Sequence, residues 1–484
     1  MPLVFVLVPL IALLAINLPL GSLGKRLGFP VAALLAFLQI GAVLAFPAAW
    51  SGPSATTVGG LKLEFAADRL SLLLLLTIGI AALASTCVAR GLEAKPERGG
   101  TKFYDLVLLA MIGMNGVSLV TDFFSLYVFI EVTAVASYVL ISMDKAKEGL
   151  EGAFKYLILS AIATLMMLTS IGLLMAGVGD TSFAAVAAAV HGAGGGPGGG
   201  PGGGPAWILL IAAGLFVAGL CVKGGLVPFH AWVPDAYSAA PAPASVLLAG
   251  IVTKTTGVYT LIRLSLSVFA GAFHLDWVFL VLGIATVLVG ALAALWQKDM
   301  KRMLAYSSVS QVGYIVLALG AASPLGMAAA AFHLFNHAMF KGQLFVNAAA
   351  VEAQTGTRDM ESLGGLGSSM PVTSWTSVVA FLSAAGIPPL SGFWSKLLIV
   401  LALWQAGHQG FAVAAILASI LTLAYFLMLQ RKVFFGKASE ALASIKEASP
   451  WIVAPAVALA LATVAIGALF PLLWNTILVQ VARL

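Results

Sequence analysis

Long apolar runs dominate the pattern of hydrophobic and polar positions along this chain, and they recur from its first residues to its last. A helix that crosses a membrane needs roughly 20 mostly apolar residues. The runs, each bounded by charges or by Gly and Pro clusters, predict an all-α polytopic membrane protein with fourteen spans. We expect these spans at about 3–20, 29–48, 70–89, 105–120, 123–143, 156–178, 206–229, 244–264, 277–296, 304–321, 327–351, 370–404, 410–429 and 450–480.

The composition supports a membrane protein. Of the 484 residues, 61% are hydrophobic and only 9% are charged, whereas soluble domains carry about 25% charged residues. The mean hydropathy is +1.04. These values exclude a soluble globular enzyme and leave little of the chain for a soluble domain.

The cations between the expected spans are distributed unequally, and this predicts the topology. Positively charged loops stay on the cytoplasmic side. If both termini lie outside, the inner loops hold Lys25, Arg26, Arg90, Lys95, Arg98, Lys102, Lys145, Lys147, Lys155, Lys298, Lys301, Arg302, Arg358, Arg431, Lys432, Lys437 and Lys446, and the outer side holds only Lys62, Arg69, Arg263 and Arg483. The net charge of +6 therefore reflects membrane orientation, and we expect no nucleic-acid partner.

Two expected spans contain helix breakers. The seventh has Gly224, Gly225 and Pro228, and the twelfth has Gly386, Pro388, Pro389 and Gly392. Broken helices at membrane depth usually line a polar cavity. Because the breaks are five spans apart, the pattern favours two inverted five-helix repeats at 105–264 and 265–429, after an N-terminal three-helix segment at 1–104 and before a C-terminal loop and helix at 430–484. The alternative is that Gly and Pro are simply common in membrane helices.

The low-complexity stretch between Gly192 and Pro205 has no side chains to bury. We expect a flexible outer loop there and assign it no function.

Three ionisable residues within apolar runs need a reason to be there, because an intramembrane charge costs a few kcal/mol. Lys254 lies ten residues from either end of its span, about 15 Å, which is further than a lysine can reach to the surface. Glu131 lies eight residues into its span and needs a cationic partner, for which Lys223 beside the first break is the candidate. If the pair can separate, Lys223 can release a proton. The alternative is a static ion pair that holds two helices together.

Three further titratable residues share one helix face. His333, His337 and Lys341 recur every four residues in the eleventh span, and such a stripe is a plausible proton wire. A zinc site is the alternative, but lysine is a poor ligand and no acid or cysteine joins the stripe, so we expect no metal. Cys87 and Cys221 are isolated and predict no redox chemistry.

Two residues at the breaks complete the candidate relay. Lys396 lies four residues beyond Gly392, where a terminal group could reach water. His230 follows Lys223 by seven residues across the Pro228 break. It is a further candidate, although packing at the membrane surface is the commoner role for a lone histidine.

Several stretches resemble one family, the antiporter-like membrane subunits shared by respiratory complex I, Mrp-type cation/proton antiporters and membrane-bound hydrogenases. They are the Glu131 helix, VKGGLVPFHAWVPDAYSAAPAPAS at 222–245, the Lys254 helix, LAYSSVSQVGY at 304–314, HLFNHAMFK at 333–341 and GIPPLSGFWSK at 386–396. The resemblance implies fourteen helices with an inverted repeat, Glu131 and Lys223 as the coupling pair and Lys254 as a connecting lysine. It further implies His333, His337 and Lys341 as a central hydrated relay, with Lys396 as its terminal group.

Within that family the chain is most similar to the Mrp D-type proteins or to a hydrogenase-associated protein, since it stops at residue 484 without the long lateral helix of the distal complex I subunit. The expected function is proton translocation as one subunit of a redox-driven pump or a cation/proton antiporter. We expect no cofactor in this chain. The expected partners are other membrane subunits, peripheral redox subunits and the lipid bilayer, in a prokaryotic plasma membrane. The rival functions are a Na⁺(K⁺)/H⁺ antiporter subunit without a redox partner, an autonomous solute transporter, and a scaffold.

Overall fold

The structure, a computed structural model, describes residues 2–18, 22–45, 52–58, 61–92, 100–192, 206–269, 273–436, 442 and 444–474. The glycine-rich loop at 193–205 and the topology cations Lys95, Arg98, Lys437 and Arg483 lie outside these residues. The helices are α1 (Val4–Ile16), α2 (Ser22–Ala45), α4 (Arg69–Leu92), α5 (Gly100–Leu119), α6 (Phe123–Ile141), α7 (Lys147–Val178), α8 (Phe183–Gly192), α9 (Ala206–Gly224), η2 (Phe229–Ala231), α10 (Trp232–Ala239), α11 (Ala242–Leu247), η3 (Leu248–Val252), η4 (Lys254–Tyr259), α12 (Thr260–Ser267), α13 (Leu275–Leu295), α14 (Met300–Leu319), α15 (Pro324–Thr355), α16 (Leu366–Ser369), α17 (Pro371–Ala385), α18 (Ser391–Gln405), α19 (Gln409–Val433), α20 (Pro450–Ala468) and α21 (Phe470–Leu473).

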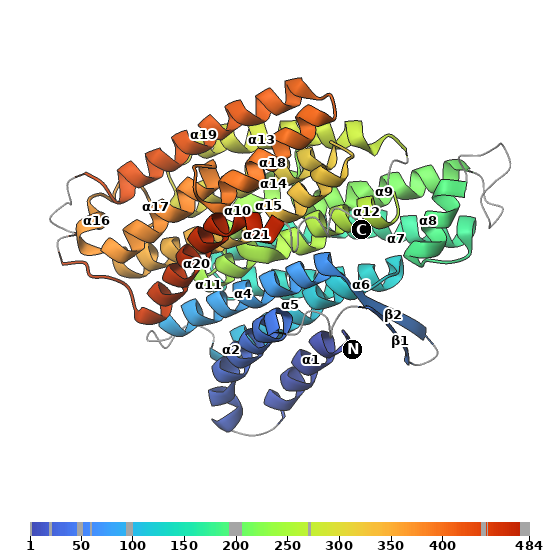
Figure 1. Cartoon of the computed structure of the whole chain (residues 1–484). Coiled ribbons are helices and arrows are strands. Elements are labelled where there is room, and N and C mark those ends of the chain that lie inside the picture. Colours follow the sequence, from blue (N-terminus) through green and yellow to red (C-terminus); the bar gives the residue numbers. More distant parts are fainter. Residues whose placement is uncertain are drawn as a thin grey trace.

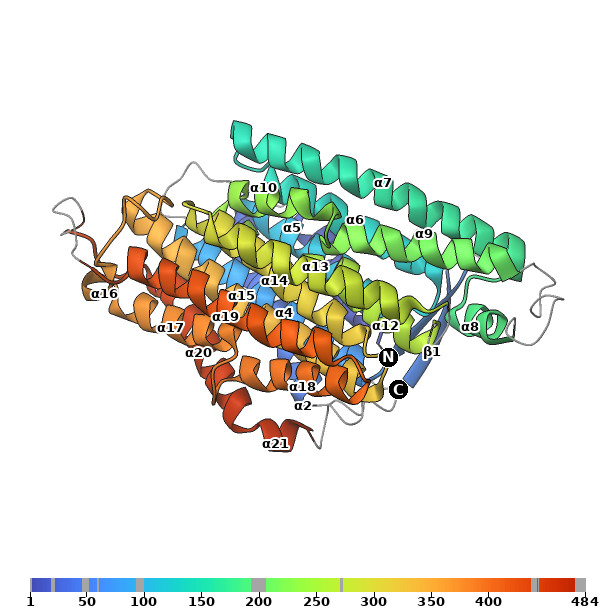
Figure 2. The same cartoon turned by 90° about the horizontal axis from the view of Figure 1, so that it is seen from above.

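These helices pack side by side in one bundle (Figure 1). The N-terminal helices α1 and α2 lie along one edge, and α7 forms another edge when the bundle is seen from above (Figure 2). Helix α15 lies inside and contacts α4, α14, α17, α18 and α20. The chain is thus an all-helical bundle apart from one small sheet.

That sheet is an element that the apolar runs did not predict. Strands β1 (Gly52–Val58) and β2 (Leu61–Ala67) form an antiparallel hairpin between α2 and α4. The alternation of Leu61, Leu63 and Phe65 with Lys62 and Glu64 is typical of a strand and was the available signal. Helix α8 was likewise not expected.

Ten described segments are long and apolar enough to cross a membrane. The chain is therefore an integral membrane protein, as predicted. The expected spans at 3–20, 304–321, 327–351 and 370–404 are not among the ten. The first corresponds to α1, of 13 residues, and the last to α17 and α18, of 15 residues each. The other two correspond to α14 and α15, which other helices enclose and which carry polar side chains where a lipid-facing helix carries apolar ones.

Two segments are enclosed along most of their length, and they carry four of the predicted relay residues. Residues 242–262 and 328–351 are all buried. Lys254 lies in the first segment, and the His333 stripe lies in the second. Because neither segment faces lipid, side chains such as Asn336 can lie in it beside Ala and Gly.

Lys301 is not the loop cation that the topology argument expected. It lies in the first turn of α14 with a side chain only 2% exposed. Its ammonium donates a hydrogen bond of 2.7 Å to the carbonyl of Ala240, directly after the last residue of α10, and lies 3.7 Å from Glu352. The C-terminus of a helix attracts cations, so Lys301 ties α14 to α10. We call the end of the bundle that carries Lys301 the basic end.

At the opposite end of the bundle, Arg263 lies in α12, which directly follows the π-helical segment of Lys254. Arg263 links α12 to α4. Its guanidinium donates two hydrogen bonds to Asp68, the residue before α4, and one of 2.9 Å to Ser71. Burial raises the pKa of Asp68, but the hydrogen bonds and charge of Arg263 outweigh it and hold that pKa below its usual value. Asp68 therefore stays ionised in mildly acidic solution.

Candidate functional site

Glu131 and Lys223 form an ion pair, as the sequence predicted. The Lys223 ammonium lies 2.6 Å from Glu131 Oε1 and also donates to the hydroxyl of Ser160 on α7. The same carboxylate oxygen accepts a hydrogen bond of 2.6 Å from Thr164. The Lys223 side chain is fully buried, whereas that of Glu131 is 27% exposed. The pair thus lies at the edge of the bundle with its acid partly accessible.

The first helix break positions Lys223. Helix α9 ends at Gly224, and Gly225 follows in the left-handed conformation with φ +68°. The chain then turns through Pro228 into η2 and α10. The indole of Trp232 donates a hydrogen bond of 3.1 Å to the Val222 carbonyl, which satisfies a backbone acceptor near the end of α9. Lys223 therefore lies in a last helical turn that α10 holds in place.

Lys254 lies in a wide helical segment made of η3 and η4, both π-helical. Its ammonium donates to the Ala249 carbonyl. No acid forms a salt bridge with it among the described residues. Such π-helical turns are rare and occur often at functional sites. Lys254 is thus a buried cation with a neutral partner.

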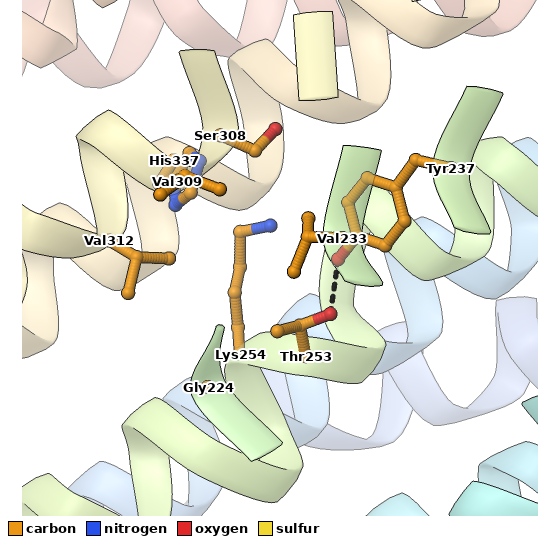
Figure 3. A pocket seen from close by; sticks show the side chains of 9 residues that line it. All are labelled: Gly224, Val233, Tyr237, Thr253, Lys254, Ser308, Val309, Val312 and His337. Atoms are coloured by element: carbon orange, nitrogen blue, oxygen red, sulfur yellow. Dashed lines mark hydrogen bonds between the residues drawn. The ribbon is translucent and has the colours of Figure 1, made fainter. Parts of the chain in front are cut away.

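A small cavity lies between Lys254 and His337 (Figure 3). Its lining consists of Gly224, Val233, Tyr237, Thr253, Lys254, Ser308, Val309, Val312 and His337. Figure 3 shows the Lys254 side chain rising between the His337 ring and the hydrogen-bonded pair of Tyr237 and Thr253. The space is about the size of one water molecule. It lies between the π-helical segment that carries Lys254 and α15.

Lys223 and Lys254 are separated by a close helix crossing. A Cβ atom added to Gly257 would lie 2.3 Å from the Gly224 backbone, a distance that no real contact allows. Only glycine at residue 257 lets η4 approach α9 this closely. The crossing fixes the spacing of the two lysines.

The three predicted residues of α15 lie in a row, as their spacing indicated. Lys341 donates to Ser307 and, at 3.2 Å, to the Leu304 carbonyl, both on α14. The His333 and His337 rings are stacked with centroids 6.3 Å apart. Neither nitrogen of His337 has a hydrogen-bond partner in the part of the chain that the structure describes.

The second helix break brings Lys396 to this row. Helix α17 ends at Ala385 and α18 begins at Ser391. In its second turn, Ser395 shares a hydrogen bond of 2.9 Å with His333 Nδ1. The Lys396 ammonium lies 4.3 Å from the centre of the Tyr314 ring and 3.3 Å from Ser419. The structure thus brings Lys396 and the histidines together.

His230 stands apart from these contacts. It lies in η2, half-buried, with its ring centre 6.5 Å from that of Tyr306. No described hydrogen bond joins it to Lys223 or Lys254. Its place in the relay stays a prediction.

Sequence reasoning missed the neutral residues that hold the charged ones. Ser160 and Thr164 contact the ion pair from α7, and Tyr314 and Ser419 contact Lys396. Their only signal was helical spacing, since Ser160 and Thr164 lie four residues apart. Within the described residues, no group of three or more His, Cys, Asp or Glu side chains could hold a metal ion.

The fold and these side chains define a class of protein, a polytopic membrane protein with a row of buried ionisable groups. The family model of the transmembrane region of NADH:quinone oxidoreductases and Mrp antiporters matches residues 120–422. The chain therefore belongs to this family of proton-translocating, antiporter-like membrane subunits, which confirms the resemblance seen in the sequence.

Particular relatives agree with that assignment. The chain is 35% identical over 436 residues to the N subunit of the NADH-quinone oxidoreductase of Desulforudis audaxviator, covering 88% of this chain and 85% of that protein. It is 32% identical over 344 residues to the D subunit of the Na⁺/H⁺ antiporter of Alkalihalophilus pseudofirmus, covering 70% and 67%. A chain in the Mrp complex from Dietzia sp. DQ12-45-1b superimposes with a TM-score of 0.88 at 25% identity, covering 99% of this chain and 96% of that one.

Proposed function

We propose that this chain carries protons through the membrane along Glu131, Lys223, Lys254, His333, His337, Lys341 and Lys396. The single observation that supports the proposal is that several buried lysines contact only neutral groups. Lys254, Lys341 and Lys396 contact carbonyls, hydroxyls and aromatic rings, and none forms a salt bridge within the described residues. An unpaired buried charge is costly, so groups of this kind exchange protons more readily than they stabilise a fold.

The contacts support one order of transfer. Protons enter at Glu131 and Lys223, pass Lys254 and the cavity beside His337, and leave through His333 and Lys396. The His333–Ser395 hydrogen bond links α15 to the helix of Lys396. A cavity with room for about one water suits protons and excludes a bulky solute, which disfavours the solute transporter.

The architecture proposed with this path has fourteen membrane-crossing units, with both termini outside. The two broken units are α9 with α10, and α17 with α18. We propose inverted repeats at 105–264 and 265–429, flanked by segments at 1–104 and 430–484. The limits at 264 and 429 fall within α12 and α19, so the repeats end with these helices, at residues 267 and 433.

The driving energy is proposed to come from partner subunits. The relatives named above are subunits of an NADH-quinone oxidoreductase, a Na⁺/H⁺ antiporter and an Mrp complex. We infer a place in such a complex in a prokaryotic plasma membrane. A redox-driven pump and a Na⁺(K⁺)/H⁺ antiporter are both supported by these relatives. Proton uptake that needs an electron donor indicates the pump, and uptake driven by a Na⁺ or K⁺ gradient indicates the antiporter.

The test is proton translocation by the native complex in sealed vesicles with Lys223→Ala in this chain. We expect coupled translocation to be lost while the complex still assembles. Lys298→Ala is the matched control, because Lys298 pairs with Glu361 at 3.0 Å but is 70% exposed, and surface pairs contribute little. Normal translocation by assembled Lys223→Ala complex would refute the proposal.

A further inference from the structure

Helices α14 and α15 form an antiparallel hairpin whose register is fixed by two contacts. Near the basic end, Lys341 donates a hydrogen bond to Ser307. Two turns away, the Tyr314 ring lies 5.9 Å from the His333 ring. These contacts are seven residues apart on α14 and eight residues apart on α15, which is about two helical turns on each.

The residues halfway between these contacts are Gln311 on α14 and His337 on α15. Gln311 lies four residues after Ser307 and three before Tyr314, so it shares their face of α14. His337 lies four residues from both His333 and Lys341. The register of the hairpin therefore places Gln311 level with His337.

Both side chains at this level are enclosed and unsatisfied. Gln311 and His337 are fully buried. Neither amide atom of Gln311 and neither ring nitrogen of His337 has a hydrogen-bond partner among the residues that the structure describes. Buried polar groups are nearly always hydrogen-bonded, to protein or to ordered water. Two unsatisfied groups at one level of the same hairpin point to water between them.

The surroundings give this water a place in the path. On α19, the Tyr425 hydroxyl lies near the Gln311 amide and near Thr422, but outside hydrogen-bond geometry with either. The cavity shared with Lys254 also lies against His337 (Figure 3). His337 thus borders the cavity of Lys254 and, by the register of the hairpin, lies level with Gln311; its imidazole has two nitrogens without a partner in the described chain.

We propose that Gln311 is a positioning residue that holds water against His337 and so completes the central part of the relay. The inference rests on the proposed function. One nitrogen of His337 takes a proton from the Lys254 side, and the other nitrogen gives a proton to the water that Gln311 holds. The amide carbonyl accepts a hydrogen bond from that water and the amide N–H donates one, so Gln311 keeps its own protons throughout.

The first test replaces Gln311 by Leu in the native complex. We expect translocation to slow at least about tenfold, because the water that donates to or accepts from His337 would lose its hydrogen bond to Gln311, and one hydrogen bond is worth about a factor of ten in rate. The ratio of rates in H₂O and D₂O should rise, because proton transfer becomes limiting. Gln311→Asn, which keeps an amide, should recover part of the rate. Gln343→Leu is the control. Gln343 is equally buried and its amide oxygen also lacks a partner in the described chain, but its amide nitrogen, unlike that of Gln311, donates to the Thr376 carbonyl on α17; its rate and isotope ratio should stay normal.

Two comparisons separate this inference from the proposed function. If Lys254→Met lowers the number of protons moved per turnover while Gln311→Leu leaves the rate and the isotope ratio unchanged, only the role of Gln311 is wrong. If Lys254→Met translocates normally, the proposed path itself is wrong. A density map of the wild-type complex that resolves waters tests the inference without any variant. We expect an ordered water bonded to the Gln311 amide, and an amide packed dry against apolar side chains would overturn the assignment.

Discussion

The two parts of the buried row differ in how each charge is balanced. At the edge of the bundle, Lys223 meets a carboxylate 2.6 Å away, and the side chain of Glu131 is partly exposed on α6. At the centre, Lys341 is fully enclosed and donates to a hydroxyl and a carbonyl. A counter-ion keeps a buried lysine protonated, whereas a buried lysine with only neutral partners loses its proton more easily. The edge therefore suits control by a neighbour, and the centre suits transfer.

Substitution of Lys341 should have the largest effect at the centre, comparable with the loss expected for Lys223→Ala at the edge. Lys341→Ala removes a group that we propose carries a proton, and we expect translocation to fall about 100-fold or more. Lys341→Arg keeps the charge, but arginine does not release its proton, so the loss should be similar. The measurement is the initial rate of proton uptake by vesicles that contain the assembled complex. If Lys341→Arg restores the rate, the centre needs only a fixed positive charge. The claim that Lys341 transfers a proton, unlike the ion pair at the edge, would then be wrong.

The ion pair at the edge can be tested as a unit. In Glu131→Gln with Lys223→Met, both charges are replaced by neutral groups of similar size, and such replacement often preserves stability. We expect normal assembly and a rate of coupled translocation at least about tenfold lower. Glu361→Gln with Lys298→Met, at the exposed pair, serves as control. Normal pumping by the Glu131/Lys223 double variant would show that the pair only holds helices together.

A smaller effect is expected at the crossing of η4 and α9, which lies between Lys223 and Lys254. Gly257→Ala places a methyl group against the Gly224 backbone and pushes η4 from α9, at a cost of about 1–3 kcal/mol. The wider spacing of Lys223 and Lys254 should slow translocation several-fold. Gly214→Ala on α9 meets open space and should change neither rate nor thermal stability. Equal behaviour of the two variants would mean that the crossing does not set the transfer distance.

The smallest effect on transport is expected at Asp68. Asp68→Asn leaves the Arg263 guanidinium without its counter-ion, so the free energy of unfolding should fall by about 3–5 kcal/mol. The assembled complex should still translocate protons normally. The pKa of Asp68 is lowered in the fold, so its contribution is full above the unfolded pKa of about 3.9 and is lost as the pH falls through the lower folded value. Thermal melts of both proteins should therefore differ at neutral pH and converge in strong acid. A difference that persists there would contradict the role of the carboxylate charge.

The candidate site could be predicted from sequence wherever a local pattern determines it. The four-residue spacing places His333, His337 and Lys341 on one face of a helix whatever surrounds that helix. Lys223 stood out because a charge beside a glycine pair is rare within an apolar run. In each case the energetic cost of an intramembrane charge was enough to mark the residue.

The rest depends on how distant segments pack. Ser160, Gln311 and Ser419 are ordinary polar residues in sequence, and only the packed bundle places them beside charged groups or level with one. The same limit explains Lys301, which has the sequence context of a loop cation but packs against the end of α10. The hairpin at 52–67 contains no long apolar run. Its only signal in sequence is the alternation of apolar and polar residues over strands of seven residues.

Lys254→Met in the otherwise native complex tests the central claim most directly, because Lys254 lies between the edge pair and the α15 row. The measurement is the number of protons moved per turnover of the driving reaction in sealed vesicles. A continuous proton path through this chain predicts fewer protons per turnover from a fully assembled complex. An unchanged number would show that protons do not pass through Lys254 and would contradict the account.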